Sequence, residues 1–321
     1  MFLTKRTGRG LQIPRPRCHN DPLMTVVGRL APSPTGSLHV GNVRTFLWAW
    51  LSARAQGGRV LLRVEDLDTP RLRDGVVPKM IDDLRWLGFD WDGDIAVQSE
   101  RREHYKEVFA RLAGKVYPCR CTRGDIAAAQ SAPHEGDQEL RYPGSCRDVA
   151  GPGIAWRLRV EPGAVEFEDR LFGKQSIDVG ATVGDFVVAK TPEQPAYQLA
   201  VVSDDLAQGV TEVVRGDDLI PSTARQILVY RALGATPPAY AHVPLVVGPD
   251  GKRLAKRFGD AQIATLRARG VSPERIIGVL AAWSSLGAGD ATPACLVPKW
   301  SWDKVPRERL VLSPERLSEL S

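Results

Sequence analysis

Short apolar runs alternate with longer amphipathic segments along the first third of the chain. The runs at Val26–Leu30 and Arg59–Val64 have the length of buried strands. Helical patterns fill the intervals, at residues 40–56, 76–87 and 99–113. Gly57-Gly58 supplies a stop signal for the first helix. This order of strand, helix, strand and helix predicts a parallel α/β sheet.

The alternation breaks between Tyr117 and Gly153, where the chain is rich in Pro, Gly and Cys. Beyond this stretch the pattern predicts extended runs at 155–160, 165–169, 186–190 and 197–202. It then predicts a strand at 210–214, a helix capped by Ser222 or Thr223 that runs to Leu233, a loop at 251–256 and a helical region at 261–286. We therefore expect an α/β domain in two halves, 24–116 and 154–240, with an insertion at 117–153 and a loop and helical C-terminal region at 241–321.

Composition and charge narrow the class of protein. Of the 321 residues, 43% are hydrophobic and 25% are charged, and no apolar run approaches the roughly 18 residues of a membrane span. We expect a soluble enzyme or binding protein with no membrane partner. Five basic residues and one acidic residue in 1–23 account for +4 of the net charge of +5, and this Gly- and Pro-rich extension is predicted to be disordered. Five cysteines, an odd number, without an export signal indicate a reducing compartment, the cytoplasm.

The loop between the first strand and the first helix carries the first candidate chemistry, Pro32-Ser33-Pro34-Thr35-Gly36-Ser37-Leu38-His39-Val40-Gly41-Asn42. Open α/β sheets bind ligands at the carboxyl ends of their strands, and a helix N-terminus offers free amides to phosphates. Gly36 and Gly41 allow the backbone to approach a nucleotide, and His39 adds a donor for an α-phosphate. Taken alone, the loop also fits a Pro- and Gly-rich turn with a helix-capping histidine.

With its flanking residues, this loop resembles the first signature ("HIGH") of class I aminoacyl-tRNA synthetases, in the form of their glutamyl branch. Asn42 stands where the signature ends in His. The resemblance continues in order to about residue 287, through 62–68, 98–101, 197–205 and 214–219. Residues 253–257 resemble the second signature ("KMSKS"), with Ala255 in place of the common Ser. In isolation this basic run would be an ordinary solvated loop.

The resemblance implies a Rossmann-type sheet and activation of an amino acid with ATP and Mg²⁺. It implies catalytic roles for His39 and Lys256, which would neutralise charge on the phosphates. It also implies an ATP site formed by Pro34, Gly36, His39, Gly41, Asn42, Arg253, Leu254 and Lys256.

The choice of the amino-acid substrate can be argued from the charges of the residues that would bind it. Glutamate presents one ammonium and two carboxylates, so its site needs an anion and guanidinium donors. Glu65, at a strand end, is placed for the ammonium, and Arg29 and Arg215 for the carboxylates, in an order that the sequence leaves open. The resemblance implies a glutamate site formed by Arg29, Leu30, Ala31, Ser33, Glu65, Tyr197 and Arg215. His104 and His242 are expected to be ordinary, hydrogen-bonded histidines.

A cysteine cluster in the insertion predicts a structural zinc site. Cys119, Cys121 and Cys146 supply three thiolates, and tetrahedral zinc needs a fourth ligand. Ligand chemistry favours His134, because imidazole is a far commoner zinc ligand than phenolate. The resemblance favours Tyr142, since Cys-x-Cys followed by Tyr-x-x-x-Cys matches the zinc motif of a short relative of glutamyl-tRNA synthetase. Three free thiols are the remaining alternative.

The length of the chain indicates which part of a tRNA would receive the activated amino acid. Only 64 residues follow Arg257, where a full glutamyl-tRNA synthetase carries a large helical anticodon-binding region. With the cysteine motif, this resembles a short branch of the family and implies a monomeric ligase that activates L-glutamate and transfers it to queuosine in the anticodon stem-loop of tRNA(Asp). The alternatives are a truncated synthetase that charges a tRNA 3′ end, a nucleotidylyltransferase that uses no tRNA, and a non-catalytic RNA-binding paralogue.

Overall fold

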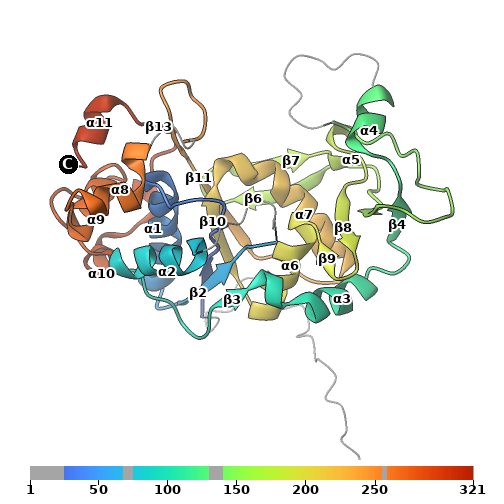
Figure 1. Cartoon of the computed structure of the whole chain (residues 1–321), viewed down its shortest axis with the longest axis horizontal. Coiled ribbons are helices and arrows are strands. Elements are labelled where there is room, and N and C mark those ends of the chain that lie inside the picture. Colours follow the sequence, from blue (N-terminus) through green and yellow to red (C-terminus); the bar gives the residue numbers. More distant parts are fainter. Residues whose placement is uncertain (1–24, 68–74, 130–139, 255–258, 321) are drawn as a thin grey trace, which may run out of the picture.

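A mainly parallel sheet with helices on both faces forms the centre of the molecule, with an antiparallel edge strand at residues 173–177 (Figure 1). The computed structural model describes residues 25–67, 75–129, 140–254 and 259–320. The sheet has two parts, whose strands lie in the orders β3-β2-β1 and β10-β11-β6-β7. The amide of Thr211 donates to the carbonyl of Val27 at 2.9 Å and links β1 to the start of β10. The strands are β1 (Val27–Leu30), β2 (Arg59–Val64), β3 (Ala96–Val97), β6 (Val165–Asp169), β7 (Gly173–Ile177), β10 (Glu212–Gly216) and β11 (Ala239–Val243).

Alternate residues of the strands enter two different hydrophobic cores, because both faces of the sheet are covered. Leu62 and Val64 pack with α1 and the C-terminal helices, whereas Leu61 packs with α6 and α7. The helices around the sheet are α1 (Val40–Ala55), α2 (Val76–Trp86), α3 (Arg102–Ala110), α6 (Tyr197–Gln208) and α7 (Ile220–Ala232). The predicted parallel α/β domain is confirmed, and Gly57 follows α1 in the left-handed conformation (φ +65°) that suits a helix end.

Two predictions about local structure are wrong. Residues 197–202, expected to be extended, begin helix α6. The run is apolar because the helix is buried on most of its circumference, and such a run has no periodicity that separates it from a strand. Ser222 and Thr223 lie inside α7 and do not cap it; the helix begins at Ile220, with Pro221 in its first turn.

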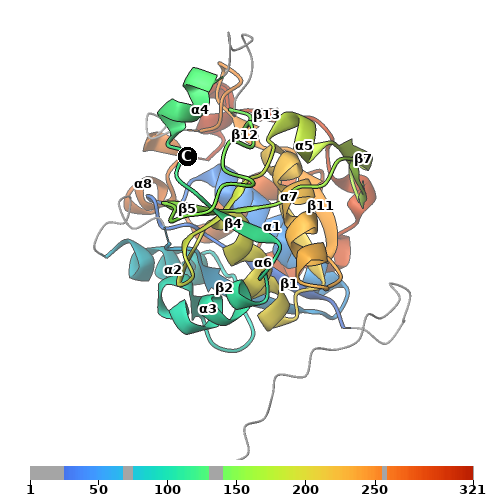
Figure 2. The same cartoon turned by 90° about the vertical axis from the view of Figure 1, so that its right-hand side faces the viewer.

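An antiparallel sheet forms one end of the molecule, at the right of Figure 1 and facing the viewer in Figure 2. Its strand order is β4-β5-β8-β9, so it continues beyond the predicted insertion boundary at residue 153. Its elements and neighbouring helices are β4 (Val116–Cys119), α4 (Arg123–Ala129), β5 (Ala155–Leu158), α5 (Val179–Thr182), β8 (Val187–Thr191) and β9 (Gln194–Pro195). The cysteine cluster lies beside β4.

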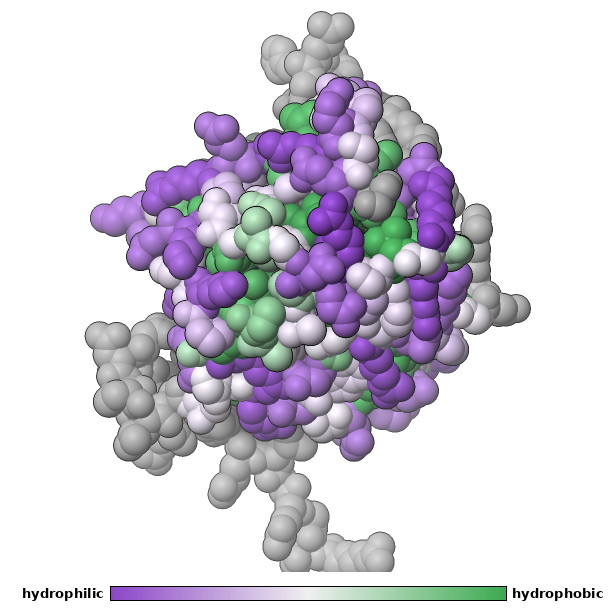
Figure 3. Space-filling view, turned by 90° about the vertical axis from the view of Figure 1, so that its left-hand side faces the viewer, coloured by the Kyte–Doolittle hydropathy of each residue, from purple (hydrophilic) through white to green (hydrophobic). Residues whose placement is uncertain are grey.

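The helical C-terminal region covers the opposite end, and Figure 3 shows that small apolar patches there are surrounded by hydrophilic side chains. Strand β13 pairs in parallel with β12, so this region is joined to the segment that leads into residues 251–256. The elements are β12 (Val246–Val247), α8 (Ile263–Ala268), α9 (Pro273–Ala282), α10 (Pro293–Leu296), β13 (Leu310–Val311) and α11 (Pro314–Ser318). Within the described ranges no helix is long and apolar enough to cross a membrane.

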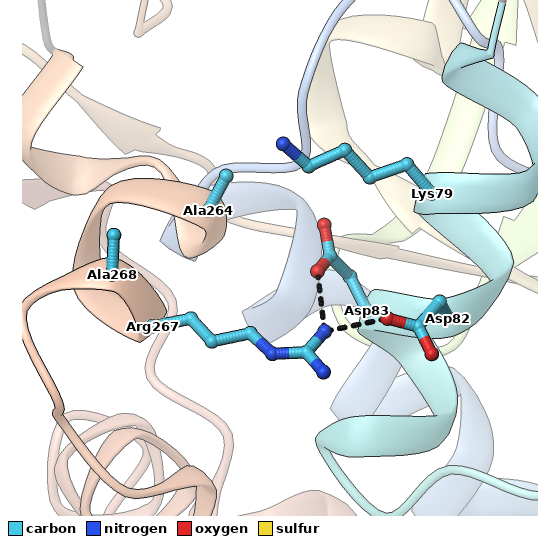
Figure 4. A pocket seen from close by; sticks show the side chains of 6 residues that line it. All are labelled: Lys79, Asp82, Asp83, Ala264, Arg267 and Ala268. Carbon is cyan, nitrogen blue, oxygen red and sulfur yellow. Dashed lines mark hydrogen bonds and ion pairs between the residues drawn. The ribbon is translucent and has the colours of Figure 1, made fainter.

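A pocket of about 330 Å³ lies between α2 and α8 (Figure 4). Arg267 bridges Asp82 and Asp83 at 2.6 and 3.3 Å, so the polar groups of the pocket largely satisfy one another. The lining consists of Lys79, Asp82, Asp83, Ala264, Arg267 and Ala268. These ion pairs join α2 to α8, which gives the pocket a structural explanation.

Candidate active site

Arg29 spans the gap between β1 and β10 at the carboxyl ends of these strands. Its Nη1 donates to the carbonyl of Val214 at 3.0 Å, while its Nε lies 3.9 Å from Asp205 and has no hydrogen-bond partner among the described residues. Burial lowers the pKa of Arg29; the charge of Asp205 opposes this, and those of Arg63 and Arg215 act with it. Since α1 follows β1 on one face of the sheet and α7 follows β10 on the other, this is the kind of crevice where open α/β sheets bind ligands.

Glu65 lies directly after β2, beside the loop that follows β1. Its amide donates to the carbonyl of Pro32 at 3.0 Å, which joins the two loops. Its carboxylate accepts from Arg63 at 3.2 Å and is largely buried. Burial raises the pKa of Glu65 and outweighs the opposing charges of Arg63 and Arg29. A bound ammonium would favour the ionised form of Glu65, as the predicted role requires.

Beneath these residues lies a buried charge cluster to which the sequence analysis gave no role. Arg63 donates to Asp205 and Gln208, both at 2.7 Å, and to Glu65. Asp204 is also buried and accepts hydrogen bonds from Gln98, Arg101 and Tyr105. A charged residue inside the apolar strand at 59–64, and two acids in the apolar run at 197–205, were the signals that could have identified this cluster.

Arg215, on β10, is fixed by neutral acceptors. Its Nε donates to Nε2 of His242 at 3.1 Å and its Nη2 to the hydroxyl of Thr223 at 2.6 Å. Nη1 is buried and has no partner among the described residues. His242 in turn bonds to Asp169. His242 is hydrogen-bonded, as expected, but the sequence gave no indication that it contacts a candidate substrate residue.

The other residues expected in the glutamate site lie around the same strand ends. Leu30 is buried at the end of β1, Ala31 is half-buried beside it, and Ser33 is exposed. Tyr197 is the first residue of α6 and is 42% exposed. The charges of Arg29, Glu65 and Arg215 are close enough to Tyr197 to act on its hydroxyl. The structure thus brings the predicted group together from four separate segments.

His39 caps helix α1 and keeps one ring nitrogen for another partner. Its Nδ1 accepts from the amide of Asn42 at 3.3 Å, and the Asn42 side chain accepts from the amide of His39 at 3.2 Å. Burial and the charge of Arg253 lower the pKa of His39 to about 4, so the ring is neutral near pH 7. Because Nδ1 accepts, the proton of the neutral ring is on Nε2, which is a donor. Capping and phosphate binding are therefore compatible.

Gly41 makes room for this histidine. A Cβ at Gly41 would lie 3.0 Å from the His39 ring and 3.3 Å from Val246. A Cβ at Gly36 would meet nothing within 4 Å. Pro34 is buried in the loop. The glycine that the packing itself requires is thus Gly41, whose small size sets the position of the imidazole.

Arg253, at the start of the second predicted signature, and Ile263, beyond its end, lie beside the first signature. The Ile263 amide donates to the carbonyl of Leu38 at 2.9 Å, and Arg253 acts on the pKa of His39. Arg253 pairs with Asp218 at 2.8 Å. Leu254 is buried. Lys256, the predicted second catalytic residue, lies outside the described residues.

The three cysteines converge in the manner that the zinc prediction requires. Their Sγ atoms all lie within 4.8 Å of one another, and Sγ of Cys121 is 3.5 Å from Sγ of Cys146. The Tyr142 hydroxyl oxygen accepts from the Cys119 thiol at 3.5 Å and from the Cys146 amide at 2.8 Å. Thiolates around tetrahedral zinc lie just under ~4 Å apart, given Zn–S bonds of ~2.3 Å. The three thiol groups therefore fit zinc, and the Tyr142 oxygen lies beside them; His134 lies outside the described residues.

Arg157 provides positive charge at this cluster. Its Nε donates to Cys119 at 3.2 Å, and its guanidinium lies 3.8 Å from the centre of the Tyr142 ring. Burial raises the pKa of Cys146, but hydrogen bonds from the Arg120 amide and from neighbouring side chains outweigh it and lower the pKa to about 7. These surroundings favour the thiolate form of Cys146, whereas burial and the hydrogen bond with Cys146 raise the pKa of Cys121 to about 11.

Residues 25–287 match the family model for the catalytic domain of class I tRNA synthetases (E and Q). The chain belongs to this family. The Glutamyl-Q tRNA(Asp) synthetase of Rhodopirellula baltica is 47% identical, over 83% of this chain and 86% of that protein. The corresponding protein of Symbiobacterium thermophilum is 44% identical, over 92% of this chain and 98% of that protein.

A solved structure shares the architecture. The crystal structure of a glutamate tRNA ligase from Elizabethkingia meningosepticum in complex with its amino acid superimposes with a TM-score of 0.78 at 27% identity. The match covers 92% of this chain and 69% of that ligase. The predicted class I synthetase fold is therefore confirmed. The family includes both glutamate and glutamine enzymes, so the choice of amino acid depends on particular side chains of the site.

Proposed function

We propose that this protein is a ligase that activates L-glutamate with ATP and transfers it to queuosine in the anticodon of tRNA(Asp). The observation that carries the proposal is the likeness to relatives named Glutamyl-Q tRNA(Asp) synthetase over most of both chains. The geometry supports it, because Glu65, Arg29 and Arg215 meet at one crevice with charges complementary to glutamate. We also propose that the enzyme acts as a cytoplasmic monomer.

In the first step, a carboxylate oxygen of glutamate attacks the α-phosphorus of ATP and pyrophosphate leaves. The glutamate is oriented by its ammonium on Glu65 and its carboxylates on Arg29 and Arg215, with Tyr197, Ser33 and neighbouring backbone completing the site. Nε2–H of His39 donates to a phosphate oxygen, and Lys256 neutralises charge as pyrophosphate forms. Mg²⁺, bound with ATP, supplies further charge neutralisation. The remaining predicted ATP contacts come from Pro34, Gly36, Gly41, Asn42, Arg253 and Leu254.

In the second step, a hydroxyl of queuosine attacks the activated carbonyl and releases AMP. The zinc that we propose for Cys119, Cys121, Tyr142 and Cys146 has a structural role, because its four protein ligands leave no open position for chemistry. The insertion, over residues 117–153 in our division of the chain, is thereby stabilised at the end of the molecule remote from the C-terminal helices.

The acceptor is tested with labelled glutamate and four RNA samples. Two are tRNA(Asp) that carries queuosine, either intact or with the 3′-terminal adenosine removed; the others are tRNA(Asp) without queuosine and intact tRNA(Glu). We expect label in both queuosine-bearing samples and none in the other two. Label on tRNA lacking queuosine, or only on samples with an intact 3′ end, would instead identify a truncated synthetase that charges the 3′ ribose.

The activation step is tested separately by glutamate-dependent ATP–pyrophosphate exchange, with and without tRNA. A nucleotidylyltransferase with another substrate, or a non-catalytic RNA-binding paralogue, would show no exchange with glutamate. This measurement separates a wrong enzyme class from a wrong acceptor.

A further inference from the structure

The Arg215 guanidinium differs from its neighbour Arg63 in the charge of its partners. Arg63 contacts the carboxylates of Asp205 and Glu65 directly. Arg215 contacts an imidazole and a hydroxyl, and in the described part of the chain no carboxylate lies within ion-pair distance of it. The positive charge of Arg63 is therefore neutralised by the protein, whereas that of Arg215 is left for another group.

The state of His242 follows from its bonds. Its Nε2 accepts from Arg215, so this nitrogen carries no proton. Its Nδ1 must then carry the proton and donate it to Oδ2 of Asp169, 2.7 Å away. Burial also lowers the pKa of His242, although the bond to Asp169 opposes this. His242 is thus a neutral group between an anion and a cation.

Asp169 is held firmly at the far side of this imidazole. Its Oδ1 accepts from the amides of Leu171 and Phe172 at 3.0 and 2.9 Å. Its Oδ2 accepts from the amide and the ring of His242. Both side chains are fully buried. Because the carboxylate is fixed by backbone amides, it orients the ring of His242 without itself contacting Arg215.

The order of the strands indicates which carboxylate of glutamate meets Arg215. Strand β1, which carries Arg29, lies between β2 and β10. Glu65 follows β2 and Arg215 lies on β10, so these two residues are on opposite sides of Arg29. The α-carboxylate is attached to the carbon that bears the ammonium, so it remains near Glu65 and Arg29. The side-chain carboxylate, further along the substrate, would then be the one that reaches Arg215. This is the group that differs between glutamate and glutamine.

We propose that Asp169 and His242 are positioning residues that make the site prefer glutamate over glutamine, by holding Arg215 through a neutral acceptor. The inference rests on the proposed function and deepens it. An arginine with uncompensated charge and a buried free donor, Nη1, binds a carboxylate far better than an amide. A carboxylate placed directly against Arg215 would remove most of that difference.

Three variants separate the parts of this arrangement. In His242→Gln, the side-chain oxygen can still accept from Arg215, but the bond to Asp169 is lost. In His242→Asn, the side-chain NH2 can still donate to Asp169, but the shorter side chain does not reach Arg215. The double variant Asp169→Asn/His242→Glu moves the carboxylate to Arg215 at unchanged total charge. His104→Gln is the matched control, since this half-buried histidine bonds to Ser203 of α6 and contacts no proposed substrate residue.

The readout is kcat and KM for ATP–pyrophosphate exchange with glutamate and with glutamine, alongside thermal unfolding. We expect His104→Gln to keep the wild-type preference, and His242→Gln to lose part of it, because the acceptor for Arg215 remains but Asp169 no longer orients it. We expect His242→Asn to raise the KM for glutamate by about tenfold or more with little change in kcat, the range for a lost hydrogen bond to a charged group. The double variant should show the largest fall in the ratio of glutamate to glutamine activity.

Two results would overturn the proposal. One is an unchanged KM and an unchanged preference in both His242→Asn and the double variant. The other is an equal loss in His104→Gln, which would mark a general effect of removing a half-buried histidine. A wild-type protein that is inactive with glutamate would refute the proposed function itself, so the two failures are distinguishable.

Discussion

Arg63 and Asp205 form an ion pair that solvent scarcely reaches, with Nη1 and Oδ1 2.7 Å apart and side chains 0% and 2% exposed. The pair stands directly beneath the proposed substrate residues, because Arg63 also donates to Glu65, and Asp205 lies 3.9 Å from Arg29. Asp205 thus fixes the position of one proposed substrate residue through Arg63 and acts on the other by its charge.

Removing Asp205 should therefore destabilise the protein strongly. Asp205→Ala leaves Arg63 buried with less compensating charge, and breaking a buried pair in this way costs about 3–5 kcal/mol. Urea denaturation measures the loss. The matched control is Asp82→Ala, which breaks an exposed pair with Arg267 and should cost under about 1 kcal/mol. Equal losses of unfolding free energy in the two variants would show that the buried Arg63–Asp205 pair contributes no more to stability than an exposed pair.

Glu65 should make glutamate affinity depend on pH. Burial raises the pKa of this carboxyl above its ordinary value, and the substrate ammonium needs the ionised form. As the pH falls through the raised pKa, protonated Glu65 no longer attracts the ammonium, so the KM for glutamate should rise. The effect should begin at a higher pH than the ordinary pKa of a glutamate side chain. Above the raised pKa, Glu65 is ionised, so glutamate binds most tightly there and the KM no longer changes with the protonation of this group.

The control for this pH effect is Glu65→Gln, measured over the same pH range by pyrophosphate exchange. This variant should bind glutamate weakly at every pH and lack the acid-side rise in KM. An acid-side rise that persists in Glu65→Gln would mean that another group is responsible.

Regular amphipathic patterns allowed much of the fold to be predicted from the sequence. Helix α1 was predicted to within a residue, because Gly57-Gly58 gives a strong stop signal next to an apolar segment of helical length. Helix α6 was missed because the apolar residues at its start surround the helix on most sides and mimic a strand. The start of α7 was missed because Pro221 in the first turn, which marks it, was passed over in favour of Ser222 and Thr223.

Some residues of the candidate site could likewise be predicted from the sequence, and others could not. Residues that contact a substrate have a charge dictated by that substrate, so Arg29, Glu65 and Arg215 could be proposed from sequence. Residues that hold them, such as Asp205 and His242, come from distant segments and meet only in three dimensions. Their roles depend on burial and bond direction, which a single sequence does not contain.

His39 should act as a neutral donor in activation. Its pKa of about 4 means that it does not titrate near neutral pH, and its Nε2–H is the available donor. His39→Ala should reduce pyrophosphate exchange by about 10²–10³-fold, the size of a lost transition-state donor. Lys256→Ala, outside the described residues, is expected to cause a loss of similar size.

The pH dependence distinguishes this role from that of a charged histidine. Between about pH 6 and 9, the exchange rates of wild type and His39→Ala should depend on pH in the same way. A ring that stays neutral over this range contributes no ionisation to the pH–rate profile. Thermal unfolding confirms that the variant is folded. A limb that disappears in His39→Ala would show that the ring changes charge in this range, and near-normal exchange would remove His39 from the mechanism.

The cysteine cluster should bind about one zinc ion per chain, as one tetrahedral site requires. Cys121→Ser should lose the metal and lower the stability of the antiparallel sheet, because β4 carries Cys119 and would lose its link to Cys146. Binding of ATP should persist, since its proposed site lies at β1 and α1. Metal analysis and ATP titration measure both effects. Cys295→Ser, at an exposed cysteine outside the cluster, should keep the metal.

The fourth ligand is decided by two further variants. If the Tyr142 oxygen binds zinc, as its position beside Cys119 and Cys146 suggests, Tyr142→Phe should lower zinc affinity while His134→Ala leaves it unchanged. Tyr142→Phe keeps the ring that stacks on Arg157, so a change in affinity reports on the oxygen alone. The reverse result would assign the ligand to His134 within the same site. Metal-free wild-type protein of full stability would show instead that the three cysteines are free thiols.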